Sequence, residues 1–192
     1  MSEIMEKYEH FKSLVTKRKD EFTSLMNFVE NETAYLSAPA STRYHLNHEG
    51  GLLEHSVNVC EALLKLRLAL SPGISEESCV VVALLHDLGK AGVPGKPLYL
   101  PNTPTQKQKE YGIAAPFRMS DRLTYMSVPV RSLYLIGPRF PLTEDEAQAI
   151  VYHDGQYVDD NHSVAAKEKP LLLLLHYADN WSSFVTEKRS NR

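Results

Sequence analysis

A histidine and an aspartate, His86 and Asp87, directly follow an uncharged apolar run at residues 79–85. Such a run predicts a helix or strand that is buried on all sides. An unpaired carboxylate at its end would cost several kcal/mol to bury, or would be neutralised by a proton. A nearby positive charge removes this cost, and a divalent metal ion is the simplest candidate.

Two more polar side chains, His55 and Asp179, lie on the apolar faces of other predicted helices. His55 shares a face with Leu52 and Val59, and Asp179 shares one with Leu175. Taken singly, a buried histidine or aspartate is more often a hydrogen-bonded core residue than a ligand. Each such explanation needs its own partner, however, whereas one divalent cation satisfies all four residues. Two imidazoles and two carboxylates suit Mn²⁺, Fe²⁺, Co²⁺, Ni²⁺, Zn²⁺ or Mg²⁺.

Composition and charge limit the classes of protein to which the chain can belong. Its 192 residues fit one domain with a small appendage, and the net charge of -3 argues against extended nucleic acid as a partner. The two cysteines, Cys60 and Cys79, are expected to be buried thiols of a reducing compartment. The N-terminus has no apolar core of signal-peptide length, and the apolar run at residues 171–175 is too short for a membrane span. We therefore expect a cytoplasmic protein without a membrane partner.

Hydrophobic periodicity and helix-boundary residues predict an all-α fold. Residues 92–118 are rich in proline and glycine and predict a long ordered loop, and residues 119–127 could form a short helix. We expect six to eight helices in one compact domain, with an N-terminal helical extension at residues 1–40 and the main helical domain at residues 41–188. The principal expected helices span residues 3–32, 52–70, 75–90, 128–136, 143–154 and 170–188.

Three sequence blocks carry the four candidate ligands. They are residues 50–55 (GGLLEH), 86–90 (HDLGK) and 175–180 (LHYADN). Their order resembles the H…HD…D signature of the HD-domain superfamily of metal-dependent phosphohydrolases, over roughly residues 40–185. The blocks look closest to HD domains of a bacterial 3′–5′ exoribonuclease and of small stand-alone HD hydrolases. The resemblance implies an all-helical fold that hydrolyses a phosphate ester or anhydride, with Lys90 close to the substrate phosphate and with metal ligands His55, His86, Asp87 and Asp179.

The chain departs from the pattern of HD members that bind two metal ions. Those members supply further histidines between the His-Asp pair and the last aspartate. His153 could be one of them, but the helix expected at residues 128–136 offers Arg131 in place of the other. We therefore expect one divalent ion, with a second ion at His153 as the alternative. The chain also lacks the segment typical of HD 5′-deoxynucleotidases, which argues against that substrate class.

Cations are needed where a phosphoryl group gains negative charge, and Lys90, Arg43 and Arg131 are the candidates. Arg43 could equally be an ordinary surface charge, whereas Arg131 stands among apolar residues. His153 could donate a proton to the leaving oxygen, bind a second ion, or only interact with the C-terminal end of its helix. Tyr99 could stack on a base of the substrate, or it could serve only in packing.

Two further residues, His176 and Asp154, are expected to orient the metal ligands. His176 is three residues before Asp179 and therefore lies on the same helix face. Contacts of this kind fix the direction in which a ligand points. Simple packing is the alternative for His176.

The sequence as a whole favours a metal-dependent phosphohydrolase that acts on a nucleotide or a similar small phosphorylated compound. A 3′–5′ exonuclease or a cyclic-nucleotide phosphodiesterase on the same site is the alternative among enzymes. Outside enzymes, the alternative is a non-catalytic HD module that binds a nucleotide or a metal. Loss of a ligand would mark such a module, and all four ligand positions are filled here.

Overall fold

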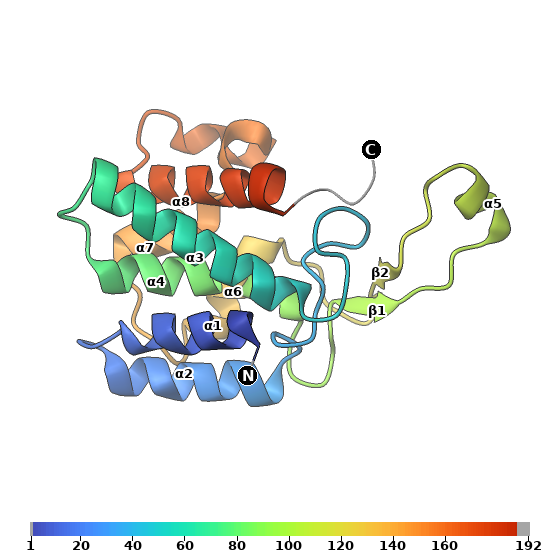
Figure 1. Ribbon diagram of the computed structural model, residues 1–192, viewed down its shortest axis with the longest axis horizontal. Helices are drawn as coiled ribbons and strands as arrows, with labels where there is room; N and C mark the ends of the chain where they lie inside the picture. The colour runs from blue at the N-terminus through green and yellow to red at the C-terminus, as the bar shows by residue number, and fades with distance from the viewer. Residues whose placement is uncertain (1, 188–192) are drawn as a thin grey trace.

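The structure is a computed structural model, and it describes residues 2–187. Two helices, α3 (Gly51–Leu70) and α4 (Glu76–Leu85), pack against each other at its centre. Figure 1 shows α8 (Pro170–Trp181) on one side of this pair, where it contacts both helices. These three helices carry or adjoin all four of the predicted metal ligands.

Four more helices complete the bundle around this centre. In Figure 1, α1 (Glu3–Ser13) and α2 (Lys19–Glu32) lie on the side opposite α8. The helices α6 (Val128–Ile136) and α7 (Glu144–Tyr152) contact each other, and α7 also contacts α4 and α8. Within the described residues the only sheet has two short strands, so the predicted all-α fold is confirmed.

The central helix α4 is buried because all of its side chains after the first turn are apolar. Residues 79–85 are fully buried. Ser75 caps the helix by accepting a hydrogen bond from the amide of Ser78, and Glu76 and Glu77 stand at its positive end. Burial of these apolar side chains fixes where the following His-Asp pair lies.

The end of α4 differs from the expectation of a helix that continues to residue 90. The α-helix ends at Leu85, His86 is its C-cap, and a separate 3₁₀ turn, η1 (Leu88–Ala91), follows. Ser132 of α6 explains the break, because its hydroxyl donates to the carbonyl of His86 and accepts from the amide of Gly89. The break turns Asp87 out of the helix between these two segments.

The N-terminal segment also differs from the expected single helix at residues 3–32. It is divided into α1 and α2 by a short connection at residues 14–18. The amides of Thr16 and Lys17 donate to the carboxylate of Glu77, at 2.9 and 2.7 Å. Because a distant carboxylate satisfies these amides, the helix need not continue through them.

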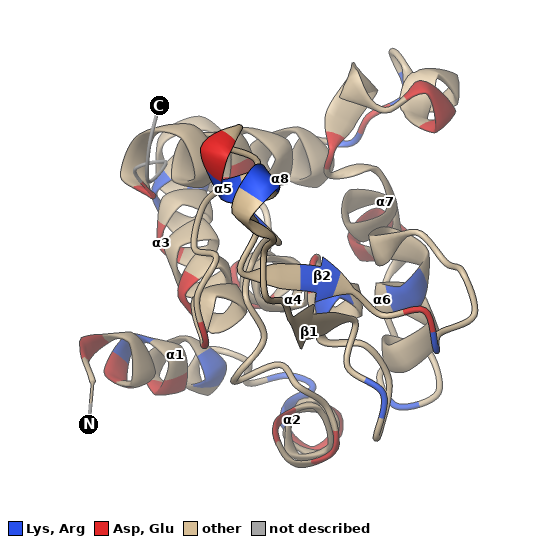
Figure 2. Cartoon of the chain, turned by 90° about the vertical axis from the view of Figure 1, so that its right-hand side faces the viewer, with Lys and Arg blue, Asp and Glu red and all other residues tan. Residues whose placement is uncertain are grey.

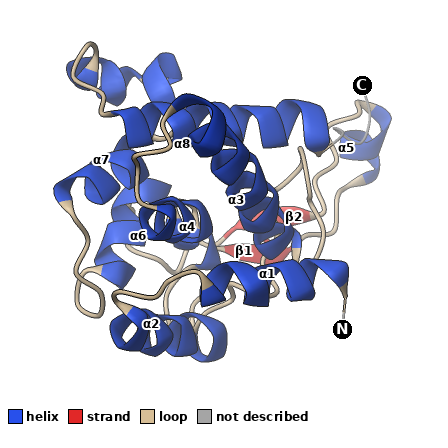
Figure 3. Cartoon of the chain, turned by 60° about the vertical axis from the view of Figure 1, so that its left-hand side comes forward, coloured by secondary structure: helices blue, strands red, loops and turns tan. Residues whose placement is uncertain are grey.

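The proline-rich insert forms a narrow arm that extends from the helical body (Figure 1). Strand β1 (Tyr99–Pro101) pairs antiparallel with β2 (Phe117–Met119), and the short helix α5 (Gln106–Glu110), which lies between them in the sequence, stands apart from the strand pair (Figure 3). Three-residue strands are too short to show a clear alternation in the sequence, so they were not predicted. The short helix considered at residues 119–127 is absent from the structure.

One cluster of buried apolar side chains includes residues of α1 and α2 together with residues of α3, α4, α7 and α8. The expected division of the chain near residue 40 stays a prediction. Residue 188, the expected end of the main helical domain, lies outside the described residues.

Both cysteines, Cys60 and Cys79, are buried free thiols. No described helix is long and apolar enough to span a membrane. Acidic and basic residues are interspersed over the helices in Figure 2.

Candidate metal centre

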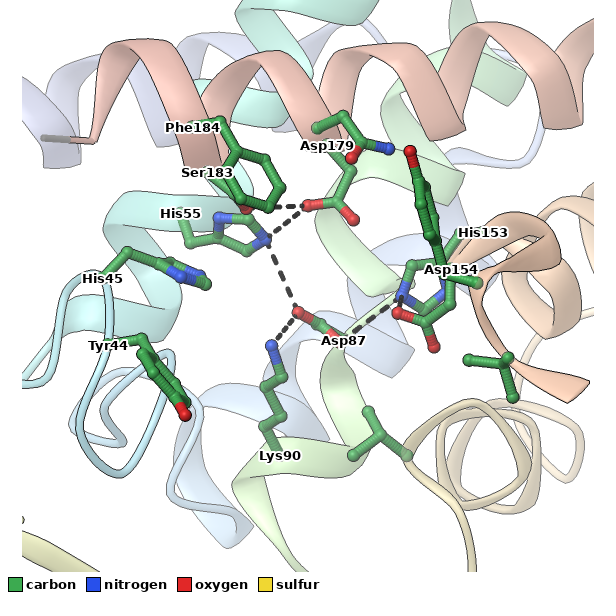
Figure 4. A pocket seen from close by; sticks show the side chains of 14 residues that line it. Tyr44, His45, His55, Asp87, Lys90, His153, Asp154, Asp179, Ser183 and Phe184 are labelled. Carbon is green, nitrogen blue, oxygen red and sulfur yellow. Dashed lines mark hydrogen bonds and ion pairs between the residues drawn. The ribbon is translucent and has the colours of Figure 1, made fainter. Parts of the chain in front are cut away.

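The four predicted ligands meet at one place, although they come from distant parts of the chain, and Figure 4 shows three of them, His55, Asp87 and Asp179. Nε2 of His55 on α3 lies 3.2 Å from Oδ1 of Asp179 on α8. The same nitrogen lies 3.3 Å from Nε2 of His86 and 3.5 Å from Oδ2 of Asp87. Asp87 and both histidines are almost completely buried, and Asp179 is mostly buried.

Hydrogen bonds at the opposite nitrogen fix the direction of each imidazole. Nδ1 of His86 lies 2.9 Å from the carbonyl of Ala83, and Nδ1 of His153 lies 2.9 Å from the carbonyl of Ile150. A carbonyl can only accept, so in the neutral ring the proton is on Nδ1 and the lone pair is on Nε2. Nδ1 of His55 has a carboxylate, that of Glu187, at 3.0 Å.

The donor set fits a divalent cation. Nε2 atoms and carboxylate oxygens approach one another at 3.2–3.5 Å inside the protein. Lone pairs and negative charges at these separations repel each other unless a proton or a cation lies between them. His55, His86, Asp87 and Asp179 would therefore hold the ion, with a mixed nitrogen and oxygen set that suits several transition metals and Mg²⁺.

The charges of the site oppose the effect of burial on its ionisable groups. Burial alone would raise the pKa of Asp87, but the positive charge of Lys90 and the contact with His86 hold this pKa well below its ordinary value. Burial alone would lower the pKa of His55, but hydrogen bonds with Asp179 and Glu187 raise it to about 10. Nζ of Lys90 lies 2.5 Å from Oδ2 of Asp87. The site thus favours charged groups over neutral ones.

A second set of potential ligands lies on the other side of Asp87. Nε2 of His153 is 3.7 Å from Oδ1 of Asp87, whereas Oδ2 of Asp87 faces His55 and His86. Oδ1 of Asp154 is also 3.7 Å from Nε2 of His153. Both of the groups formed by His86, Asp87 and His153 and by His153, Asp154 and Asp179 have ligand atoms within 4.8 Å of one another. The geometry thus offers room for a second ion, and the expectation of a single ion stays a prediction.

Three of the four candidate ligands, His55, Asp87 and Asp179, line a cavity of about 660 Å³, a size common for sites that bind small molecules, whereas His86 is fully buried behind them. Lys90, His153 and Asp154 also line the cavity. The rings of Tyr44, Tyr157 and Phe184 are largely exposed. The other lining residues at the cavity rim and walls include Tyr44, His45, Val128, Tyr157, Val158 and Phe184.

The structure places the two candidate arginines and the candidate tyrosine away from this cavity lining. Arg131 is buried, and its guanidinium faces the carbonyl of Thr124 at 3.2 Å and that of Gly89 at 3.5 Å. Arg43 contacts the ring and hydroxyl of its neighbour Tyr44, which does line the cavity. Burial raises the pKa of Tyr99, whose neutral ring lies near Lys90 but is outside the described lining of the cavity.

His176 makes a different contact from the expected one with Asp179. Its Nδ1 lies 2.7 Å from the carbonyl of His153, and Asn180 packs against the same ring. The ring also fills the space beside Gly155, where a Cβ atom would lie only 2.4 Å from Cε1 of His176. His176 therefore positions the segment that carries His153 and Asp154.

Sequence reasoning missed Glu187 as part of the site. Its carboxylate is buried beside His55, eight residues after Asp179 (187 − 179 = 8). Glu187 lies beyond the end of α8 and after a π-helical turn, which shifts the register, so helical spacing did not indicate it. His45 and Tyr44 also line the cavity.

The model of the HD domain family matches residues 52–181. The matched segment covers more than half of the chain and contains all four candidate ligands. The protein therefore belongs to the HD domain family, as its sequence blocks predicted.

One curated relative is the dihydroneopterin 2′,3′-cyclic phosphate phosphodiesterase of Methanocaldococcus jannaschii. The two sequences are 26% identical over 154 residues, which are 78% of this chain and 53% of the relative. The chain thus spans about half of the length of the relative. No solved structure matched the chain.

Proposed function

We propose that the protein is a metal-dependent phosphohydrolase that cleaves a phosphate ester or anhydride of a nucleotide or a similar small phosphorylated compound. The observation that carries this proposal is the close approach of His55, His86, Asp87 and Asp179 to one another, beside a cavity that His55, Asp87 and Asp179 line. A divalent ion bound there would lower the pKa of a bound water molecule and polarise a phosphoryl oxygen. We expect one such ion.

Two further side chains have the chemistry that phosphoryl transfer needs. Lys90 places its ammonium group beside Asp87 at the cavity wall, where it can neutralise charge on a phosphoryl oxygen. His153 is held by the carbonyl of Ile150 and presents Nε2 to the cavity. This nitrogen can exchange a proton with the leaving oxygen, and Asp154 lies beside it.

A small cyclic phosphodiester is the second candidate substrate, and the M. jannaschii relative favours it, since that enzyme is named for a 2′,3′-cyclic phosphate. Hydrolysis of such a ring is a phosphate-ester cleavage and needs the same groups. A cavity of about 660 Å³ suits a compound of this size. The net charge of -3 supports a small substrate over an extended nucleic acid.

The test is a hydrolysis panel on protein stripped with a chelator and reloaded separately with Mn²⁺, Mg²⁺, Co²⁺, Ni²⁺ or Zn²⁺. The substrates are nucleoside mono- and triphosphates, 2′,3′- and 3′,5′-cyclic nucleotides, and a chromogenic phosphodiester. We expect metal-dependent release of product from at least one compound. If every compound stays intact with every metal, the protein is a binding module and the enzymatic proposal is wrong.

A variant ties the activity to this site. Asp87→Ala removes the carboxylate that faces both sets of ligands, so we expect loss of bound metal and of activity together. The circular dichroism spectrum should stay helical. Asp20→Ala, at an exposed position of α2, is the matched control and should keep both properties. Stoichiometric metal in Asp87→Ala would contradict the site assignment.

A further inference from the structure

The segment after α8 brings one buried carboxylate back to the metal centre. A π-helical turn, η4 (Ser182–Thr186), continues from α8, and the amide of Glu187 donates to the carbonyl of Ser182 at 2.8 Å. This turn is wider than an α-helical turn and changes the direction in which the next side chain points. Glu187 is 4% exposed and lies against α3.

Both carboxylate oxygens of Glu187 are directed at His55. They lie 3.0 and 3.1 Å from Nδ1 of His55, on the side of the ring away from the other metal ligands. The amide of Asn58, one turn further along α3, donates to the same carboxylate at 3.1 Å. In the described part of the chain, the ion-pair partners of Glu187 are His55 and His45, and neither lysine nor arginine is among them.

His55 differs in this respect from the other two histidines of the site. His86 and His153 each have their Nδ1 atom facing a backbone carbonyl, which no substitution can remove. Nδ1 of His55 faces a charged side chain, and hydrogen bonds to charged groups are about twice as strong as neutral ones. A carboxylate on the far nitrogen fixes the ring and strengthens the near nitrogen as a metal ligand.

His45 adds a sign that this corner serves more than packing. Its Nε2 atom is buried without a hydrogen-bond partner and lies 3.8 Å from Oε2 of Glu187. The rings of His45 and His55 are 5.2 Å apart. Burial of an unsatisfied nitrogen beside a buried carboxylate costs free energy, and a core that only needed to pack would gain by apolar side chains here.

We propose that Glu187 is a positioning residue, which holds His55 with its proton on Nδ1 and its lone pair toward the metal centre, and so sets the affinity for the ion. The proposal rests on the metal centre of the proposed function. Glu187 lies after the segment that matches the HD family model, residues 52–181, so it is a feature of this chain beyond that match. Asn58 in turn orients the carboxylate.

The test compares Glu187→Gln and Glu187→Ala with the unchanged protein. Glutamine keeps the shape and one acceptor oxygen but removes the charge, and alanine removes the contact. We expect the dissociation constant for Co²⁺, measured by calorimetry without substrate, to rise about 10- to 100-fold, more for alanine than for glutamine. Glu61→Gln is the control for loss of one negative charge. Glu61 lies on α3, the helix of His55, and pairs with Lys7 and Lys65.

A spectroscopic readout separates positioning from a structural role. Long-range ¹H–¹⁵N spectra of the Co²⁺-free protein titrated with Zn²⁺ report which nitrogen of each histidine carries the proton. In the Zn²⁺-saturated unchanged protein we expect a proton on Nδ1 of His55 and the metal ion on Nε2, and loss of this uniform state in Glu187→Ala, while His86 and His153 stay the same. Such a change would not arise if Glu187 only fastened the C-terminal segment to α3.

The possible outcomes distinguish this proposal from the proposed function. Metal affinity and His55 protonation that are unchanged in both Glu187 variants would overturn the role of Glu187. If the unchanged protein binds Co²⁺ and the Glu187 variants bind it more weakly as expected, yet the unchanged protein hydrolyses no compound, the role of Glu187 is supported and the enzymatic function is overturned. If the unchanged protein binds no ion, the metal centre and the role of Glu187 are both wrong.

Discussion

Asp87 is the residue on which the contacts of the site converge. One of its oxygens faces Lys90, His55 and His86, and the other faces His153. Its buried charge is stable only because these groups surround it, which is the physical reason that burial does not neutralise it.

Lys90 can be tested separately from metal binding. Lys90→Met keeps the length of the side chain but removes the charge beside Asp87. We expect it to bind metal with the stoichiometry of the unchanged protein, while kcat falls by about 100-fold because one group that stabilises phosphoryl charge is lost. Steady-state kinetics with metal analysis check both. An unchanged kcat would exclude Lys90 from a direct role in turnover.

At this scale the sequence pointed to four candidate ligands that the structure brings together, but it did not indicate the directions of their side chains. His55, His86, Asp87 and Asp179 could be chosen because each stood at or near an apolar face. The second polar atom of a ligand side chain can have a partner from a distant part of the chain, as Nδ1 of His55 has in Glu187. For the same reason Arg131 was a reasonable substrate-binding candidate, yet its described contacts are to backbone carbonyls.

At the scale of elements, the close approach of α6 to η1 holds the break after α4. Gly89 allows this approach, because a Cβ atom there would lie 2.2 Å from the carbonyl oxygen of Val128. This contact is with backbone, so a side chain at residue 89 would push the two elements apart. The position of Asp87, two residues earlier, depends on the same packing.

Gly89→Ala should therefore destabilise the protein. We expect the free energy of unfolding to fall by about 1–3 kcal/mol, the usual cost of overpacking, with weaker metal binding as well. Urea unfolding and calorimetry with Co²⁺ measure these effects. Gly73→Ala is the control, since a Cβ atom there meets no other atom within 4 Å. Equal stability of the two variants would contradict the assignment of a tight contact.

The sequence predicted most helices of the bundle, because their apolar faces and caps are local signals. The capping box of Thr143 and Glu146 and the proline near the start of α8 mark boundaries that the structure also shows. The boundaries that were missed depend on distant groups: Glu77 divides α1 from α2, and Ser132 ends α4.

On the scale of the whole molecule, a buried ion-pair network joins the N-terminal helices to the main bundle. Arg18 donates to Glu77 at 2.7 Å and to both carboxylate oxygens of Glu146, at 2.7 and 2.9 Å. The partners of Arg18 lie 59 and 128 residues away along the chain. No local pattern could reveal such contacts.

The network gives a prediction for stability. Arg18→Ala leaves two buried carboxylates without their cation, so we expect the free energy of unfolding to fall by about 3–5 kcal/mol at pH 7. Burial alone would raise the pKa of Glu77 and of Glu146, but hydrogen bonds with Arg18 lower both below the ordinary value of 4.5. Their stabilisation is therefore complete above about pH 4.5 and is lost as the pH falls through the lowered values.

Urea unfolding at several pH values checks both parts of this prediction. The difference in stability between the unchanged protein and Arg18→Ala should shrink below about pH 4.5, because protonated carboxyl groups no longer need the guanidinium. Lys19→Ala, at an exposed neighbouring position, should have a small effect at every pH. A constant difference across this range would show that Arg18 acts by packing alone.

The ligands of the metal centre also lie far apart along the chain, and this has a consequence for the lifetime of the protein. The candidate ligands His55 and Asp179 are 124 residues apart (179 − 55 = 124), so an ion between them would cross-link α3 to α8 across most of the fold. We expect protease digestion to be slower with bound metal than after chelation, as followed by the half-life of the intact band. The amount of protein in a cell would then depend on metal supply.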